Sequence, residues 1–227
     1  MLIGILQAGH LPDEVRPIGG DYPDLYQSFL AGQGFTFRHW PVVDMEFPDG
    51  PEEADGWLIS GSRHGAYEDL PFIPPLEALV RDIMASGRPL VGICFGHQVI
   101  AQALGGKVEK FDGGWAVGRR AYDFGGETLH LNAWHQDQVT VVPDGARVLA
   151  ENDFCANAAL VYGDKAFSVQ PHPEFGDAMV AGLIEHRGRG VVPDDLQKGA
   201  LDALGQDNDN ARLAAMIGRF FRERTPA

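Results

Sequence analysis

The first half of the chain alternates short apolar runs with segments of helical periodicity, and this alternation is the strongest constraint on its fold. The strand-like runs are residues 2–6, 35–43, 54–59 and 90–93. The helical segments are residues 22–31, 74–86 and 95–104. Asp21 precedes the first of these helices as an N-cap, and Gly105 and Gly106 follow the last as a C-cap. Strands that alternate with helices form parallel βαβ units, so this half predicts a parallel sheet.

The second half changes to short β-like runs between turns. They extend from Lys107 to Val169, and examples are residues 127–131, 138–142, 147–150, 159–162 and 166–169. After Pro173 helical spacing returns and continues to Arg222. We expect the β-like runs to add antiparallel hairpins to one edge. The predicted fold is therefore α/β, with an open, mostly parallel sheet, helices on both faces and an antiparallel strand extension. No segment resembles a linker, so we expect a single domain over residues 1–227.

Charge and composition narrow the partners that we expect. The 227 residues carry a net charge of −14 at pH 7, which repels nucleic acid and anionic membranes, so we expect neither as a partner. No stretch approaches the ~20 apolar residues that cross a bilayer, and the apolar start lacks the basic flank of a signal peptide. Two cysteines without an export signal, Cys94 and Cys155, indicate reduced thiols and a cytoplasmic location.

Cys94 lies between a buried strand and the start of a helix, in the sequence Gly92-Ile-Cys-Phe-Gly96. The carboxyl end of a strand in such a sheet is where ligands bind. The helix N-terminus stabilises a thiolate, and glycines on either side allow a strained turn. The pattern corresponds to the nucleophile elbow of G-x-S-x-G enzymes, with cysteine in place of serine. A buried structural cysteine is the alternative.

A cysteine nucleophile requires a base, and His172 is the strongest of the eight histidines. It follows the strand-like run 166–169, and Pro171 and Pro173 are expected to hold the chain extended around it. In an extended chain residues i and i+2 face the same side, so Glu174 can orient the imidazole. His135 and His97 are weaker candidates.

Two further features complete the hypothesis of acyl transfer. The backbone N–H of Phe95 directly follows the nucleophile, and the loop at residues 60–63 can supply a second oxyanion donor. A metal site would have to use residues from the set His130, His135, Asp137, His172 and Glu174. No H-E-x-x-H or paired-cysteine motif supports it, and no phosphate-binding loop is present.

Four motifs in this order resemble the class I glutamine amidotransferases over nearly the whole chain, in particular the free-standing branch near the amidotransferase domain of GMP synthase. The motifs are Leu58-Ile-Ser-Gly-Ser62, Gly92-Ile-Cys-Phe-Gly-His-Gln98, Trp134-His-Gln-Asp137 and Val169-Gln-Pro-His-Pro-Glu174. The resemblance implies a flavodoxin-like fold and a reaction that needs no metal or cofactor. Its implied catalytic residues are Cys94 as nucleophile, His172 as general base and acid, and Glu174 as orienter.

The resemblance also assigns the surroundings of the triad. It implies an oxyanion hole from the N–H groups of Phe95 and Ser62, and a contact between Gln98 and the substrate amide. We expect the substrate site to include also Gly61, Arg63, His135 and Gln136. The chain departs from the family at Ser62 and Gln136, where glycines are usual, and at Pro171, where an aromatic residue is usual.

These features predict hydrolysis of a γ-glutamyl amide through a γ-glutamyl thioester, with a small-molecule substrate. Three hypotheses compete. The chain is a glutaminase that passes ammonia to a separate synthetase subunit, a free-standing hydrolase of γ-glutamyl amines or peptides, or a catalytically silent binding module. Intact residues at Cys94, His172 and Glu174 argue against the third.

Overall fold

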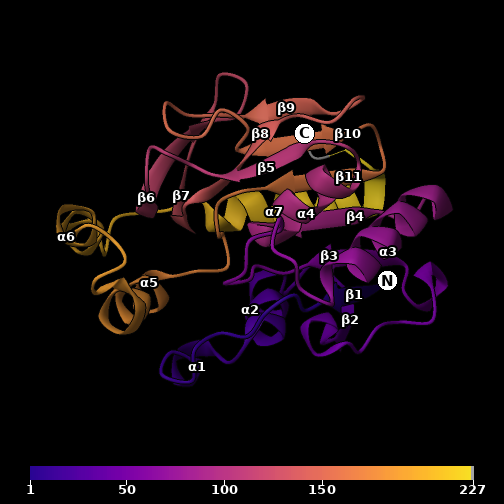
Figure 1. Ribbon diagram of the computed structural model, residues 1–227, viewed down its shortest axis with the longest axis horizontal. Helices are drawn as coiled ribbons and strands as arrows, with labels where there is room; N and C mark the ends of the chain where they lie inside the picture. The colour runs from indigo at the N-terminus through magenta and orange to yellow at the C-terminus, as the bar shows by residue number, and fades with distance from the viewer. Residues whose placement is uncertain (226–227) are drawn as a thin grey trace.

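The computed structural model describes residues 1–225, and its centre is a seven-stranded sheet (Figure 1). The strand order is β2-β1-β3-β4-β11-β10-β9. The strand bounds are β1 Leu2–Leu6, β2 Thr36–Trp40, β3 Gly56–Ile59, β4 Leu90–Ile93, β9 Arg147–Ala150, β10 Ala159–Tyr162 and β11 Ala166–Val169. β2, β1, β3, β4 and β11 run parallel, whereas β10 and β9 are antiparallel to their neighbours. The predicted mostly parallel sheet with an antiparallel extension is confirmed.

Helices cover both faces of this sheet, so that β3, β4 and β11 are buried along their whole length. One hydrophobic cluster joins Ile5 and Val91 to the helices α2 Tyr22–Phe29, α5 Asp177–Leu183 and α7 Asn210–Glu223. The other joins Leu6 and Leu90 to α3 Ile73–Ser86 and α4 Phe95–Ala103. Neighbouring residues of one strand thus supply opposite cores. Within residues 1–225, every helix is too short or too polar to traverse a lipid bilayer.

The predicted caps are present. The Asp21 carboxylate accepts a hydrogen bond from the Tyr22 N–H (2.8 Å), and Asp24 completes a capping box. At the end of α4, Gly105 adopts φ +95°, and the Gly106 N–H donates to the Ala101 carbonyl (2.8 Å). These local signals fix the ends of two helices that carry site residues.

Four strands of the second half do not join the main sheet, contrary to the expectation of hairpins at its edge. β5 Lys107–Lys110 pairs with β8 Asp137–Val141, and β6 Ala116–Asp123 pairs with β7 Thr128–His135, as two separate two-stranded sheets. β5 and β6 were not among the predicted strands. β6 continues through Gly118, which has φ +72° and packs against Ala200.

The C-terminal region is also more divided than its helical spacing predicts. α5 continues into a π-helical turn at Ile184–Gly188, and α6 Asp194–Asp202 and α7 follow after separate loops. The remaining short elements are α1 Arg16–Gly19 and the 3₁₀ turns Val42–Asp44 and Pro51–Glu53. α1 falls in the segment 9–20, where the sequence indicates a loop rich in glycine and proline.

The carboxyl ends of the parallel strands converge on one edge of the sheet. β1 leads to His10, β3 to Gly61, β4 to Cys94 and β11 to His172. β2 lies on one side of β1 and β3 on the other, so the chain reverses direction across the sheet at this point. Such a switch point is where open α/β sheets bind ligands.

We expect Gly96→Ala to destabilise the fold, because a Cβ at this position would overlap the backbone carbonyl of Ile59. Overpacking of this kind lowers the free energy of unfolding by about 1–3 kcal/mol, measurable by urea denaturation. Gly199→Ala is the matched control, since Gly199 lies exposed in α6 with open space at its Cβ. It is expected to raise the free energy of unfolding by up to ~1 kcal/mol. Equal stability of the two variants would contradict the predicted overlap.

Candidate active site

Cys94 occupies a strained turn between β4 and α4. Its backbone has φ +53° and ψ −103°, a region that residues with a side chain rarely adopt. The Cys94 N–H donates to the Val169 carbonyl at the end of β11 (2.9 Å), and the Gly96 N–H donates to the Ser60 carbonyl after β3 (3.1 Å). The turn is therefore held by the strand ends on both sides of β4, as a nucleophile elbow requires.

The two glycines of the motif allow this turn to form. A Cβ at Gly92 would overlap the Gly96 carbonyl, and a Cβ at Gly96 would overlap the Ile59 carbonyl. Neither position has a positive φ. The glycines are thus required for close approach of backbone to backbone, and the unusual dihedral angle falls on Cys94 itself.

His172 and Glu174 form a buried pair next to Cys94. Nδ1 of His172 lies 2.7 Å from Oε1 of Glu174, and their side chains are 3% and 0% exposed. The segment is not extended as expected. The Phe175 N–H donates to the His172 carbonyl (3.2 Å), so that a turn brings Glu174 to the imidazole. The Phe175 ring stacks on the imidazole, with ring centroids 4.1 Å apart, and fixes its orientation.

Opposing influences act on the charge of His172. Burial disfavours the imidazolium, but the charge of the neighbouring Cys94, together with the charge and hydrogen bond of Glu174, outweighs burial and raises the pKa of His172 to about 10. The ordinary value is about 6.5. These neighbours therefore favour the charged imidazolium form of His172.

Tyr26, which sequence reasoning missed, links Glu174 to the loop after β3. Its hydroxyl donates to Oε1 of Glu174 (3.0 Å) and accepts from the Gly61 N–H (3.0 Å). Burial and the charge of Glu174 raise the pKa of Tyr26 well above its usual value, which keeps the phenol protonated. Oε2 of Glu174 is buried and has no hydrogen-bond partner within residues 1–225.

The expected oxyanion donors are free to bind a ligand. Neither the Phe95 N–H nor the Ser62 N–H donates to another residue in the described part of the chain. Phe95 is fully buried directly after Cys94. Gly61 lies against His172, because a Cβ on Gly61 would come within 2.8 Å of the imidazole Cε1. The Gly61 N–H is occupied by Tyr26, which leaves that of Ser62 as the donor from this loop.

Gln170 is a second residue that sequence reasoning missed, although it lies within one of the four motifs. Its side-chain amide donates to Sγ of Cys94 (3.6 Å), and its Oε1 accepts from Nε2 of Gln98 (3.1 Å). Gln98 Nε2 also donates to the Asp137 carbonyl (2.9 Å). Because both contacts use Nε2, the oxygen of Gln98 is left to face a substrate. A chain of amides therefore leads from the 134–137 segment to the thiolate.

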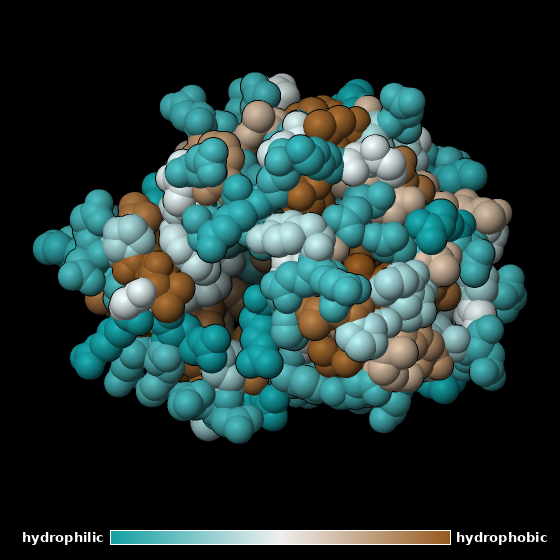
Figure 2. Space-filling view, viewed as in Figure 1, coloured by the Kyte–Doolittle hydropathy of each residue, from teal (hydrophilic) through white to brown (hydrophobic). Residues whose placement is uncertain are grey.

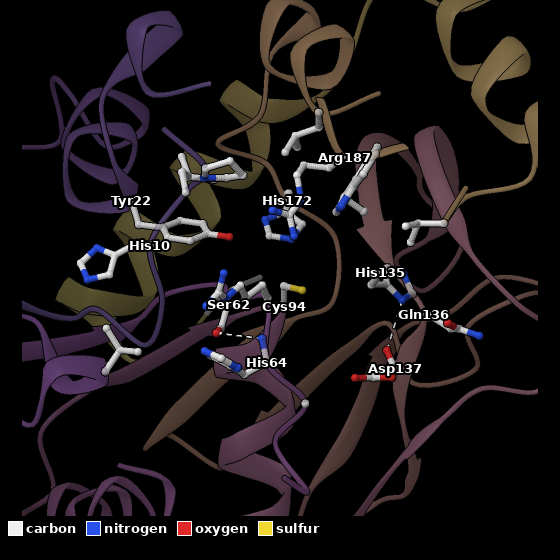
Figure 3. A pocket seen from close by; sticks show the side chains of 18 of the residues that line it. His10, Tyr22, Ser62, His64, Cys94, His135, Gln136, Asp137, His172 and Arg187 are labelled. Atoms are coloured by element: carbon white, nitrogen blue, oxygen red, sulfur yellow. Dashed lines mark hydrogen bonds between the residues drawn. The ribbon is translucent and has the colours of Figure 1, made fainter. Parts of the chain in front are cut away.

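The site opens into a cavity of about 740 Å³. Seven of the predicted site residues line it: Ser62, Arg63, Cys94, Gln98, His135, Gln136 and His172. The remaining three, Gly61, Phe95 and Glu174, lie directly behind this wall. Figure 3 shows the labelled side chains around Cys94, with His172 on one side of the cavity and Gln136 on the other. The face in Figure 2 is mostly hydrophilic and is hollowed between α5 and the strands of the sheet.

His135 presents a neutral imidazole to this cavity. Burial, together with the nearby charge of His172, lowers the pKa of His135 to about 3. Its Nδ1 contacts the Asp137 carbonyl (3.3 Å), whereas its buried Nε2 has no partner within residues 1–225. With Nδ1 as the donor, Nε2 is an acceptor for a group on the substrate.

The alternative residues have other environments. His97 is buried outside the cavity, with Nδ1 2.8 Å from the Ser168 hydroxyl, and burial lowers its pKa to about 3. Cys155 is 2% exposed, and burial raises the pKa of its thiol to about 12. Among residues 1–225, His, Cys, Asp and Glu side chains form no group of three or more that could hold a metal ion.

Comparison with known proteins identifies the family. A family model described as glutamine amidotransferase class-I matches residues 38–178. Gamma-glutamyl peptidase 4 of Arabidopsis thaliana is 32% identical, over 73% of this chain and 72% of the relative. A glutamine-hydrolyzing GMP synthase subunit of Halobacterium salinarum is also 32% identical, over 59% of this chain and 73% of the relative. The crystal structure of a glutamine amidotransferase from Methylobacillus flagellatus shares the fold, with a TM-score of 0.76, 24% identity and coverage of 98% and 92%. The chain belongs to the class I glutamine amidotransferase family.

Proposed function

We propose that the protein hydrolyses the C–N bond of a γ-glutamyl amide, with Cys94 as nucleophile, His172 as general acid and base, and Glu174 as its orienter. The observation that carries this proposal is the buried pair of His172 and Glu174, which lies on the same cavity as Cys94 at the edge of the sheet where ligands bind. Membership of the class I glutamine amidotransferase family supports it.

In the first half of the reaction, the Cys94 thiolate attacks Cδ of the γ-glutamyl group. A C–S bond forms, and the electron pair of the carbonyl moves to its oxygen. The N–H groups of Phe95 and Ser62 stabilise this oxyanion. When the intermediate collapses, the C–N bond breaks and the imidazolium of His172 gives its proton to the leaving amine. The product is a γ-glutamyl thioester on Cys94.

In the second half, His172 is neutral and takes a proton from water, which attacks the thioester carbonyl. The C–S bond then breaks, glutamate leaves, and the thiolate–imidazolium pair is restored. Glu174 and Tyr26 hold the imidazole in place throughout. Gln98 Oε1 and His135 Nε2 are acceptors that can position the glutamyl group.

We favour a free-standing hydrolase of γ-glutamyl amines or peptides. A cavity of about 740 Å³ lies within the range of ~300–1,000 Å³ that encloses drug-sized ligands, and so exceeds what glutamine needs. The relative named gamma-glutamyl peptidase 4 supports this choice. Transfer of ammonia to a separate synthetase is the second candidate, and the similarity to the GMP synthase subunit favours it.

Cys94→Ala is expected to lower kcat/KM by more than ~1,000-fold for every substrate of a panel of glutamine, γ-glutamyl amines and γ-glutamyl peptides. A diazo-ketone analogue of glutamine should label the native protein once, at Cys94. Cys155→Ala is the control, because that thiol is buried and protonated. Glutamate release and mass spectrometry of the labelled peptide measure both effects. Full activity of Cys94→Ala, or labelling at Cys155, would refute the assignment.

His172→Asn is expected to lower kcat by about 100- to 10,000-fold, because the side chain moves the proton. Glu174→Gln should cost less and should change the pH profile. The native pKa of about 10 keeps His172 charged until the pH rises through that value. Loss of the Glu174 charge lowers this pKa, so the alkaline limb of kcat/KM should move to lower pH. An unmoved limb in Glu174→Gln would contradict the role of its charge.

Gln170→Met should slow the reaction about tenfold, because it removes a hydrogen bond to a charged sulfur at nearly constant side-chain volume. The rate of Cys94 alkylation by iodoacetamide at neutral pH should fall as well, which a purely structural role would not require. Gln102→Met is the matched control, since Gln102 lies on the same helix as Gln98 and bonds instead to Ala66 and Glu77. Alkylation at the native rate in Gln170→Met would contradict the contact.

A further inference from the structure

The wall of the cavity carries charges of both signs, and most of its acidic side chains are already paired. The paired groups are Asp13 with Arg16 (3.1 Å), Asp44 with His10 (2.8 Å), Glu68 with His64 (3.5 Å) and Asp137 with the Tyr67 hydroxyl (3.1 Å). Glu14 is the one acidic side chain of this wall without such a partner in residues 1–225. Four of the acidic groups of the cavity therefore already have a hydrogen-bond or ion-pair partner within the protein.

Three cations of the same wall have no direct partner among the described residues, although the charge of Lys110 acts on the nearby carboxylate of Asp137. Arg63, Lys110 and Arg187 have no ion-pair or hydrogen-bond partner for their charged groups within residues 1–225. The chain as a whole has a net charge of −14. Unpaired cations gathered at one cavity therefore differ in sign from the net charge of the protein. They favour a ligand that brings negative charge into the cavity.

Arg187 lines the same cavity as His172. The departing amine takes its proton from His172, so the leaving group extends along the His172 side of the cavity. Figure 3 shows Arg187 on that side, across the cavity from Gln136. Arg187 belongs to the π-helical turn Ile184–Gly188, a rare backbone form that is frequent at functional sites. It also lies beyond residues 38–178, which the family model matches.

The other two cations occupy different walls. Arg63 directly follows the oxyanion residue Ser62, and is therefore near the bond that is cleaved. Lys110 precedes Phe111, whose N–H donates to the Gln136 carbonyl (3.3 Å). Lys110 therefore lies on the Gln136 side of the cavity, which is the side expected to bind the glutamyl end of the substrate. The two arginines, and not Lys110, are thus the cations available to a leaving group.

We propose that Arg187, together with Arg63, binds a carboxylate on the leaving amine, so that the preferred substrates are γ-glutamyl amino acids or peptides with a free carboxyl terminus. The planar guanidinium matches a carboxylate with two parallel hydrogen bonds, which a neutral amide cannot accept equally well. This inference rests on the proposed function, because it concerns the leaving group of that reaction.

The test compares γ-glutamylalanine with γ-glutamylalaninamide, which differ in the terminal carboxylate and hardly in size. Glutamate release gives kcat/KM for each peptide, and the ratio of the two values is the readout. We expect the native protein to prefer the acid by about tenfold, the effect of one hydrogen bond to a charged group. The ratio should fall toward one in Arg187→Gln and in the double variant Arg63→Gln/Arg187→Gln.

Arg189→Gln is the matched control, because Arg189 is exposed two residues away and does not line the cavity. Its ratio should equal that of the native protein. A native ratio near one, or a ratio that survives in the double variant, would overturn the inference while leaving the hydrolase function intact. Failure of the native protein to cleave either peptide or glutamine would instead overturn the proposed function, and this inference with it.

Discussion

Two backbone hydrogen bonds hold Cys94 in a conformation that it would not adopt alone, and the rest of the site depends on them. They connect the turn after β4 to Val169 on one side and to Ser60 on the other. A positive φ at a residue with a side chain costs of order 1–3 kcal/mol. The buried sheet supplies this energy, since β3, β4 and β11 are enclosed by helices on both faces. The position of the sulfur is thus a property of the sheet and not of a flexible loop.

Tyr26 extends the same rigidity across the site. Its hydroxyl group accepts from the Gly61 N–H, which precedes the proposed oxyanion donor Ser62, and donates to Glu174, the proposed orienter of His172. The capped helix α2 presents this hydroxyl from the face of the sheet that Ile5 and Val91 share. One buried group therefore fixes the loop after β3 relative to Glu174, and so relates the two proposed functions of charge stabilisation and proton transfer.

Much of this could be predicted from the sequence because its signals are local. The run Leu90–Ile93, the glycines around Cys94 and the Asp21 cap act within a few residues, and the structure has them as expected. Contacts between segments far apart in the sequence could not be predicted. Tyr26 meets Glu174 across 148 positions, and no spacing rule connects them. The strand β6 was missed because Gly118 and two arginines interrupt its apolar pattern, and β5 because lysines occupy both of its ends.

The second carboxylate oxygen of Glu174 affects the stability of the native state. Oε1 receives two hydrogen bonds, but Oε2 is buried without a partner in the described residues. An unsatisfied buried acceptor raises the free energy of the native state by about 1–3 kcal/mol, and more when it is charged. At this residue the demand of stability is opposed to that of the proposed orienting role. Selection for thermal stability alone would favour replacement of this buried carboxylate. The replacement would also remove the negative charge beside His172.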